Sequence, residues 1–104
     1  MRVVALGGGH GLAASLSALR LLETDLTGVV TVADNGGSSG RLRDELGVLP
    51  PGDLRMALAA LCADDEWGRQ WAAILQHRFD GNGPLHDHAV GNLLIAAIWE
   101  ILGD

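Results

Sequence analysis

The sequence predicts an α/β protein with a Rossmann-like, doubly wound parallel sheet, to which these 104 residues contribute two β-α units and a helical subdomain. Two short apolar runs each end in a glycine-rich stretch, and each stretch leads into a segment with helical periodicity. The remaining segments have the apolar spacing of helices, and none has the pattern of a third strand. Parallel sheets of this kind normally have several more strands. We therefore expect residues 1–104 to be the N-terminal nucleotide-binding part of a larger Rossmann-like domain.

The first β-α unit is predicted from an apolar run and a leucine face. Residues 3–6 are all apolar and precede three glycines, which is typical of a central parallel strand buried on both faces. Leu12, Leu16 and Leu19 then mark one face of a helix over 11–22. The second strand is predicted at 28–33 and ends in a turn-rich stretch at 34–40.

Two further helices follow. A short helix at 41–46 is stopped by Gly47, and a Pro-Pro-Gly loop comes after it. Asp53 is suited to cap the N-terminus of the next helix. The apolar face predicted for that helix consists of Leu54, Leu58, Leu61 and Cys62. Cys62, the single cysteine, cannot form an internal disulfide, and we interpret it as a buried core thiol.

The last two helices carry most of the large apolar side chains. A helix starting near Glu66 is expected to bury Trp67, Trp71, Ile74 and Leu75, while the preceding acidic residues complement its dipole. Residues 80–84 form a loop. The helix at 89–102 is apolar nearly all round, which predicts a buried helix. A two-stranded sheet also leaves its strand edges open. For these two reasons we expect the segment to be marginally stable or to self-associate as a homo-oligomer.

Composition narrows the classes of function. The apolar fraction of 48% and charged fraction of 19% fit a globular protein. Thirteen acidic against seven basic residues argue against nucleic-acid binding. All the basic residues are Arg, which excludes a P-loop lysine from this segment. No signal-peptide pattern precedes the first strand, and the longest apolar run, at 93–99, is too short to span a membrane; we expect a cytoplasmic protein.

The first glycine-rich stretch matches a phosphate-binding pattern. Gly9-His10-Gly11-Leu12-Ala13-Ala14 fits G-x-G-x-x-A between a strand and a helix. Glycines let the backbone approach a phosphate, and a helix N-terminus favours negative charge. Asp34 ends the second strand, where dinucleotide folds place a ribose-binding carboxylate. Gly8, Gly9, His10, Gly11 and Asp34 are therefore candidate nucleotide-binding residues; the alternative is a purely structural tight turn.

The second glycine-rich stretch is less usual. Its oxygen-bearing, hydroxyl, glycine and guanidinium groups predict further phosphate or nucleotide contacts from Asn35, Gly37, Ser38, Ser39 and Arg41. The alternative is a flexible turn with serine caps. Residues 36–40 also fit the G-x-S-x-G pattern of serine hydrolases, a minor alternative because no His has a spacing that identifies it as the base. A right-handed β-α-β crossover should place both stretches at one edge of the sheet.

Two other clusters are interpreted as structural. His86-Asp87-His88 contains groups that bind metals, but it lacks a third ligand in a recognisable spacing, so a loop or helix start is favoured. Trp67 and Trp71 have helical spacing and are interpreted as core residues.

Four motifs together resemble a known family. They are Leu6-Gly-Gly-Gly-His-Gly-Leu12, Thr31-Val-Ala-Asp-Asn-Gly-Gly-Ser-Ser-Gly-Arg-Leu-Arg43, Leu46-Gly-Val-Leu-Pro-Pro-Gly-Asp-Leu-Arg55 and Gly91-Asn-Leu-Leu94. In this order and spacing they resemble the gluconeogenesis factor (YvcK-like) family, related to the CofD-like 2-phospho-L-lactate transferases. The resemblance covers essentially the whole chain and the N-terminal third of a family member. It also adds Asn92 to the candidate site.

The resemblance implies a Rossmann-like fold and a bound nucleotide or nucleotide-sugar. In the YvcK-like branch it implies a UDP-sugar such as UDP-N-acetylglucosamine and a regulatory role in gluconeogenic growth, cell-wall precursor supply and cell shape. In the CofD-like branch it implies phospholactyl transfer to a deazaflavin, with GMP released and Mg²⁺ required. The stretch at 36–43 is closer to the first branch. His10 stands where Thr is common, and Asp87 and Ala89 replace the usual Gly and Ser around His88.

Three functions follow from these observations. The leading interpretation is a UDP-sugar-binding regulator that is not an enzyme, requires no cofactor and has no catalytic or metal-binding residues. The alternative is a Mg²⁺-dependent transferase of the CofD kind that uses Asp34 for metal. An NAD(P)-dependent oxidoreductase is the third.

Overall fold

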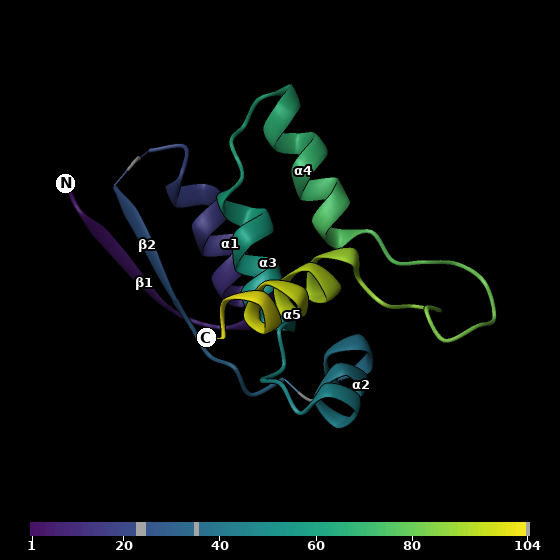
Figure 1. The fold of residues 1–104 in the computed structure, drawn as a ribbon. Helices are drawn as coiled ribbons and strands as arrows, with labels where there is room; N and C mark the ends of the chain where they lie inside the picture. Colours follow the sequence, from purple (N-terminus) through teal and green to yellow (C-terminus); the bar gives the residue numbers. More distant parts are fainter. Residues whose placement is uncertain (23–24, 35, 104) are drawn as a thin grey trace.

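The chain begins with a strand, a helix and a second strand, and the elements that follow are all helices (Figure 1). The computed structural model describes residues 1–22, 25–34 and 36–103. Its elements are β1 (Val3–Gly7), α1 (Gly9–Leu19), β2 (Leu26–Val30), α2 (Gly37–Leu46), α3 (Gly52–Leu61), α4 (Glu66–Gln76) and α5 (Val90–Leu102). The order of elements and the α/β class are confirmed.

The sheet consists of β1 and β2 in parallel, with Val3 opposite Leu26 and Gly7 opposite Val30. One face packs against α1 and α3. The other face is open within this chain: Val4 and Leu6 are 61% and 74% exposed. The expectation that the first strand is buried on both faces is therefore wrong for this chain, because helices cover only one side of the sheet (Figure 1).

The core lies between the sheet and two helices. Leu12 and Leu16 of α1 and Ala57 and Ala60 of α3 form its buried cluster, which confirms the predicted leucine face at positions 12 and 16 but not at Leu19. Leu16 is fully buried, and its Cδ1 would lie 3.2 Å from a Cβ placed on Gly28. The missing side chain at Gly28 thus lets α1 approach β2 closely.

Several boundaries differ from the predictions, and two of them are helix starts within glycine-rich sequence. Helix α1 begins at Gly9 rather than 11, and α2 begins at Gly37 rather than 41. Strand β2 covers Leu26–Val30 rather than 28–33. Glycine-rich segments carry no apolar periodicity, so their helical turns are not visible as a pattern. Much of both predicted loops is therefore the first turn of a helix.

Helix α3 buries a different face from the predicted one. Ala57, Ala60 and Arg55 are buried, whereas Leu58 and Leu61 are exposed. Alanines allow the close approach of α1, so the larger leucines lie on the other side. The N-cap position is Pro51, so Asp53, which lies in the first turn, is not the cap. Residue Cys62 is only partly buried at the end of the helix, so the core-thiol interpretation is also wrong.

Helix α4 begins as predicted. Asp65 is its N-cap, and the Oδ1 of Asp65 accepts a hydrogen bond from the backbone N–H of Gly68 at 2.7 Å. Of the four side chains expected to be buried, only Leu75 is; Trp67, Trp71 and Ile74 are exposed. The two tryptophans contact each other edge to face with centroids 5.8 Å apart. Trp67 is 68% exposed and Trp71 38% exposed, so both side chains remain partly open to solvent.

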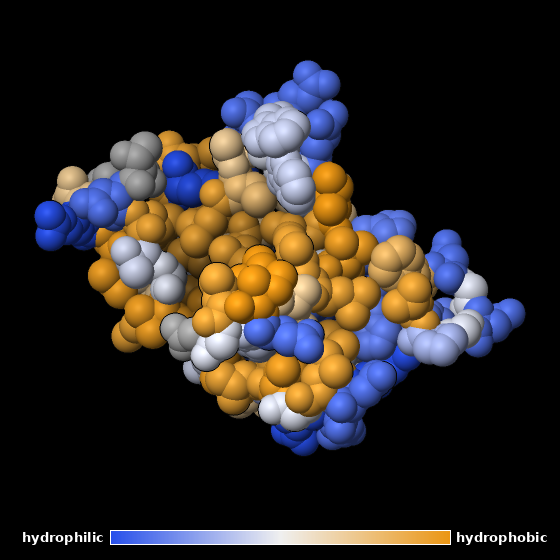
Figure 2. Space-filling view, in the orientation of Figure 1, coloured by the Kyte–Doolittle hydropathy of each residue, from blue (hydrophilic) through white to orange (hydrophobic). Residues whose placement is uncertain are grey.

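Helix α5 is buried along one stripe only. Gly91, Asn92, Ile95 and Ala96 are buried, while Leu94, Ile98, Ile101 and Leu102 are exposed, so the prediction of a fully buried helix is wrong for this chain. Figure 2 shows apolar residues gathered over the face formed by α5 and the strands. None of the helices in the described residues has both the length and the apolar character needed to cross a membrane.

Candidate functional site

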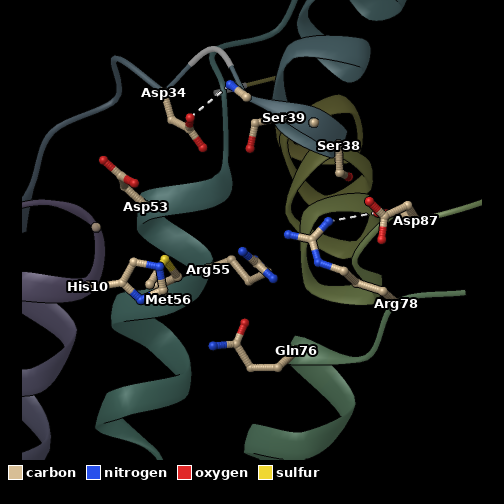
Figure 3. Close-up of a pocket in the computed structure, with 13 residues that line it drawn as sticks. His10, Asp34, Ser38, Ser39, Asp53, Arg55, Met56, Gln76, Arg78 and Asp87 are labelled. Carbon is tan, nitrogen blue, oxygen red and sulfur yellow. Dashed lines mark hydrogen bonds between the residues drawn. The ribbon is translucent and has the colours of Figure 1, made fainter.

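The two glycine-rich stretches meet where β1 and β2 end, as the crossover argument predicts. Both contribute to one open pocket of about 560 Å³ (Figure 3). Its wall also includes parts of α3, the end of α4 and the loop before α5. The lining residues are Gly9, His10, Asp34, Gly36, Gly37, Ser38, Ser39, Asp53, Arg55, Met56, Gln76, Arg78 and Asp87.

The first stretch needs glycine for two different reasons. A Cβ on Gly8 would collide with Thr31 Oγ1 and would lie 2.6 Å from the Oδ2 of Asp53. Gly9 has φ +60°, in the left-handed region that favours glycine. Gly8 therefore lets the stretch lie close to the start of α3, and Gly9 lets the backbone turn there.

The second stretch packs against α3 in the same way. A Cβ on Gly52 would collide with the Oγ of Ser39 and would lie 2.5 Å from the Oδ2 of Asp34. The Oδ1 of Asp34 accepts a hydrogen bond from the N–H of Gly36 at 2.9 Å, a turn in which an Asp side chain holds its own backbone (Figure 3). This contact fixes the carboxylate at the pocket wall and leaves Oδ2 for other partners.

Two helix N-termini open on this pocket without a side-chain cap. Helix α1 follows Gly8 and α2 follows Gly36, and neither glycine has a side chain that could cap the N–H groups of its helix. The first-turn residues Gly9 and His10 of α1 and Gly37 to Ser39 of α2 line the pocket. The first N–H groups of a helix have no partner within the helix, so both turns offer donors to an anionic or oxygen-rich ligand.

Arg55 brings a buried positive charge to the pocket. The residue is 6% exposed, and within the described part of the chain its Nε has no hydrogen-bond partner. Burial lowers the pKa of Arg55, and the positive charge of Arg78 lowers it further, against the opposite effects of Asp34 and Asp53. An NH1 of Arg78 donates to the backbone oxygen of Asp87 at 2.7 Å.

A hydrogen-bonded network lies behind the first turn of α2. Ser38 Oγ accepts from the N–H of Ala89 at 3.3 Å and from the Nδ2 of Asn92 at 3.1 Å, and it lies 2.7 Å from the Nδ1 of His88. A hydroxyl has one proton and two lone pairs, so with both lone pairs used its proton goes to His88. His88 is then neutral with its own proton on Nε2.

The surroundings of His88 favour this neutral form. Burial lowers the pKa of His88, and Arg41 and Arg78 lower it too, while Glu45 and Asp87 act in the opposite direction. Ser38 and His88 are both buried, so the G-x-S-x-G match here forms a structural network. A hydrolase nucleophile needs an accessible lone pair, which Ser38 lacks.

The predicted site residues divide into three groups. Gly9, His10, Asp34, Gly37, Ser38 and Ser39 line the pocket. Gly8, Gly11, Arg41 and Asn92 lie outside its lining, and Arg41 instead donates to the backbone oxygens of Pro84 and of His86, the latter at 2.5 Å. Asn35 lies outside the described residues.

Sequence reasoning missed part of the lining. The residues concerned are Gly36, Asp53, Arg55, Met56, Gln76, Arg78 and Asp87. Asp53 and Arg55 belong to the third motif of the family resemblance and could have been found there. Gln76 and Arg78 have no local signal, since only the packing of α4 brings them to the pocket.

Residues 1–22, 25–34 and 36–103, which include the histidine-rich loop, contain no cluster of three or more His, Cys, Asp or Glu that could hold a metal ion. The backbone at Asp87 has φ +62°, in the left-handed region. Glycine adopts this backbone conformation more readily than a residue with a side chain does.

The fold and site define the class of protein: an α/β protein whose candidate ligand pocket lies at the carboxyl ends of parallel strands. The sequence profile of the family described as 2-phospho-L-lactate transferase CofD matches residues 3–104, and the chain belongs to this family.

Similar proteins carry names that refer to a gluconeogenesis factor and not to a transferase. A Mycobacterium tuberculosis relative is 66% identical over 102 residues, which cover 98% of this chain and 30% of the relative. The Bacillus subtilis gluconeogenesis factor is 46% identical over 103 residues, covering 99% of this chain and 32% of that protein. The chain therefore spans about a third of the length of these curated relatives.

A solved structure shows the same fold. A crystal structure of a Bacillus halodurans protein matches with a TM-score of 0.87 and 46% identity over 99% of this chain and 32% of that chain. A second structure of that protein, described as a member of the UPF0052 family, gives 0.85 and 44% over 100% of this chain and 33% of that chain.

Proposed function

We propose that the pocket binds a nucleotide-sugar, with a UDP-sugar such as UDP-N-acetylglucosamine as the ligand class. The observation that carries the proposal is the pair of uncapped helix N-termini, α1 and α2, that open on one pocket. Their N–H donors suit the phosphate or hydroxyl oxygens of a ligand, and the carboxylates of Asp34 and Asp53 suit ribose or sugar hydroxyls. The pocket thus offers both kinds of partner that a nucleotide-sugar needs.

We further propose a regulatory role in carbon metabolism, cell-wall precursor supply and cell shape, in which the ligand is bound and not consumed. The name of the Bacillus subtilis relative, gluconeogenesis factor, supports the metabolic part of this role. The resemblance of residues 36–43 to the YvcK-like branch supports the choice of UDP-sugar over a transferase substrate.

One observation favours a second candidate, a Mg²⁺-dependent transferase of the CofD kind. Asp34 and Asp53 both line the pocket, and Mg²⁺ in proteins is commonly held by one or two carboxylates together with substrate phosphates. These two residues would hold the ion, which would supply charge neutralisation at the phosphates. The description of the matching family supports this candidate at the level of family only.

Calorimetric titration with UDP-N-acetylglucosamine, in EDTA and in Mg²⁺, distinguishes the two. We expect binding in EDTA and no nucleotide released on chromatography of the mixture. Metal-dependent release of nucleotide would overturn the regulator proposal, and absence of binding in both buffers would overturn the choice of ligand.

A further inference from the structure

We propose that Arg55 and Arg78, here called the arginine pair, form the diphosphate subsite of this pocket, so that the ligand hydroxyls face Asp34 and Asp53. This inference rests on the proposed function and gives the bound ligand a direction. It is drawn from four features of the described residues: a buried guanidinium without a direct ion pair, the glycine that fixes its stem, the fixed position of Arg78, and the placement of the acidic residues within the pocket.

The buried Arg55 has no direct ion pair or Nε hydrogen bond in the described residues, although the charges of Asp34 and Asp53 act on it. The residue is 6% exposed. A charge removed from water is costly unless it is paired and hydrogen-bonded. The side chain lines the pocket, so an anion bound there would supply the missing partner.

The position of Arg55 depends on a glycine in another helix. A Cβ on Gly91 of α5 would lie 2.7 Å from the Cγ and 3.0 Å from the Cδ of Arg55, and 2.6 Å from the backbone oxygen of Leu75. The stem of Arg55 therefore passes through space that only glycine leaves open. Packing between α3 and α5 orders this long side chain before a ligand arrives, which lowers the entropic cost of binding.

Arg78 is fixed by a backbone contact and retains donors. Its NH1 bonds the backbone oxygen of Asp87 at 2.7 Å, at the residue whose φ is +62°. A guanidinium has five N–H donors, so most remain for a ligand. Figure 3 shows the two guanidinium groups extending toward each other in the pocket. Two like charges with few acidic contacts suit a group that carries several negative oxygens, such as a diphosphate.

Of the three acidic residues that line the pocket, Asp87 lies beside Arg78, and the other two lie on the far side of Arg55. Asp34 and Asp53 lie together beside the glycine-rich stretches, while Arg78 lies on the opposite side with Arg55 between them (Figure 3). Phosphates close to the two carboxylates would be repelled unless a cation intervened. The first turn of α2, through Gly37 and Ser38, also lines the pocket and adds uncapped N–H donors. A diphosphate is therefore favoured at the arginine pair.

The test removes each charge in turn. Arg55→Gln, Arg78→Gln and the control Arg69→Gln are titrated by calorimetry with UDP-N-acetylglucosamine and, separately, with inorganic pyrophosphate. Arg69 is a matched control because it is exposed on α4 and pairs with Asp64 at 3.3 Å, outside the pocket lining. Loss of a charge-assisted contact should weaken UDP-N-acetylglucosamine binding about 10- to 150-fold in each pocket variant. Pyrophosphate binding should weaken in parallel, and Arg69→Gln should match the wild type.

Each outcome decides the inference. Unchanged UDP-N-acetylglucosamine affinity in both pocket variants overturns the subsite and leaves the proposed function standing. Arginine-dependent binding of pyrophosphate without binding of UDP-N-acetylglucosamine supports the subsite and overturns the proposed ligand. Failure of the wild type to bind either compound overturns both. If a thermal melt shows that Arg55→Gln does not fold, the exposed Arg78→Gln decides the matter.

Discussion

The hydroxyl of Ser38 lies 2.7 Å from the Nδ1 of His88, although the two residues are 50 positions apart in the chain. Ser38 also accepts hydrogen bonds from the N–H of Ala89 and from Asn92. One hydroxyl therefore joins the first turn of α2, which lines the pocket, to the end of the loop before α5 and to α5 itself. The stability of the site wall should depend on this contact.

The first prediction concerns pH. The folded state lowers the pKa of His88, so the unfolded chain binds the proton more readily. The stabilisation from neutral His88 is fully present above the unfolded pKa of about 6.5 and is lost as pH falls through the lower folded pKa. A protonated Nδ1 would also face a hydroxyl with no free lone pair.

Urea unfolding between pH 7.5 and pH 5 measures this effect. We expect the free energy of unfolding of the wild type to fall with pH more steeply than that of His88→Asn, whose amide oxygen can accept the Ser38 proton and does not titrate. Equal pH dependence in the two proteins would assign the effect to other groups.

The second prediction concerns Ser38 itself. Ser38→Ala leaves His88, Asn92 and the N–H of Ala89 without this partner in a buried region, and should lower the free energy of unfolding by about 1–3 kcal/mol. Denaturant unfolding at neutral pH measures it. The control Ser15→Ala, at an exposed position of α1, should stay within about 0.5 kcal/mol of the wild type. A similar small change for Ser38→Ala would show that the network is dispensable.

The third prediction concerns Gly9. Gly9→Val should abolish UDP-sugar binding, because a β-branched side chain fills the approach to the pocket and disfavours φ +60°. Circular dichroism should show helix content largely intact. Gly11→Ala is the control, since a Cβ there meets no atom within 4 Å, and its affinity should not change. Wild-type affinity in Gly9→Val would remove the first glycine-rich stretch from the site.

The fourth prediction concerns the charge of Asp34. Asp34→Asn keeps an oxygen for the Gly36 N–H but removes the negative charge. If Asp34 accepts ligand hydroxyls, binding should weaken by ~1.5–3 kcal/mol, about 10- to 150-fold, with or without Mg²⁺. The exposed Asp44→Asn on α2 serves as the control. A metal-dependent product formed by the wild type and lost in Asp34→Asn would support the transferase instead.

The fifth prediction concerns association. The outer face of the sheet and much of α5 expose large apolar side chains, among them Val4, Leu6, Ile101 and Leu102. Contiguous apolar surface of this kind favours self-association or low stability. Analytical ultracentrifugation of the chain should show concentration-dependent association. A monomer that unfolds cooperatively at high temperature would contradict this expectation.

Some features of the protein follow from the sequence alone. Local periodicity predicted the order of the seven elements in the described residues and the Leu12–Leu16 face that enters the core. The handedness of the β-α-β crossover predicted that both glycine-rich stretches meet at one edge of the sheet. These features depend on near neighbours in the chain and on a general rule of topology, so a single sequence was sufficient.

Other features were decided only by the tertiary structure. The buried sides of α3, α4 and α5, the contact of Ser38 with His88, and the passage of Arg55 beside Gly91 each depend on residues far apart in the chain. An apolar side chain is buried only where another element covers it, and a helix with several apolar faces does not reveal which face that is. Packing made that choice, and in doing so it brought Arg55 and Arg78 to the pocket.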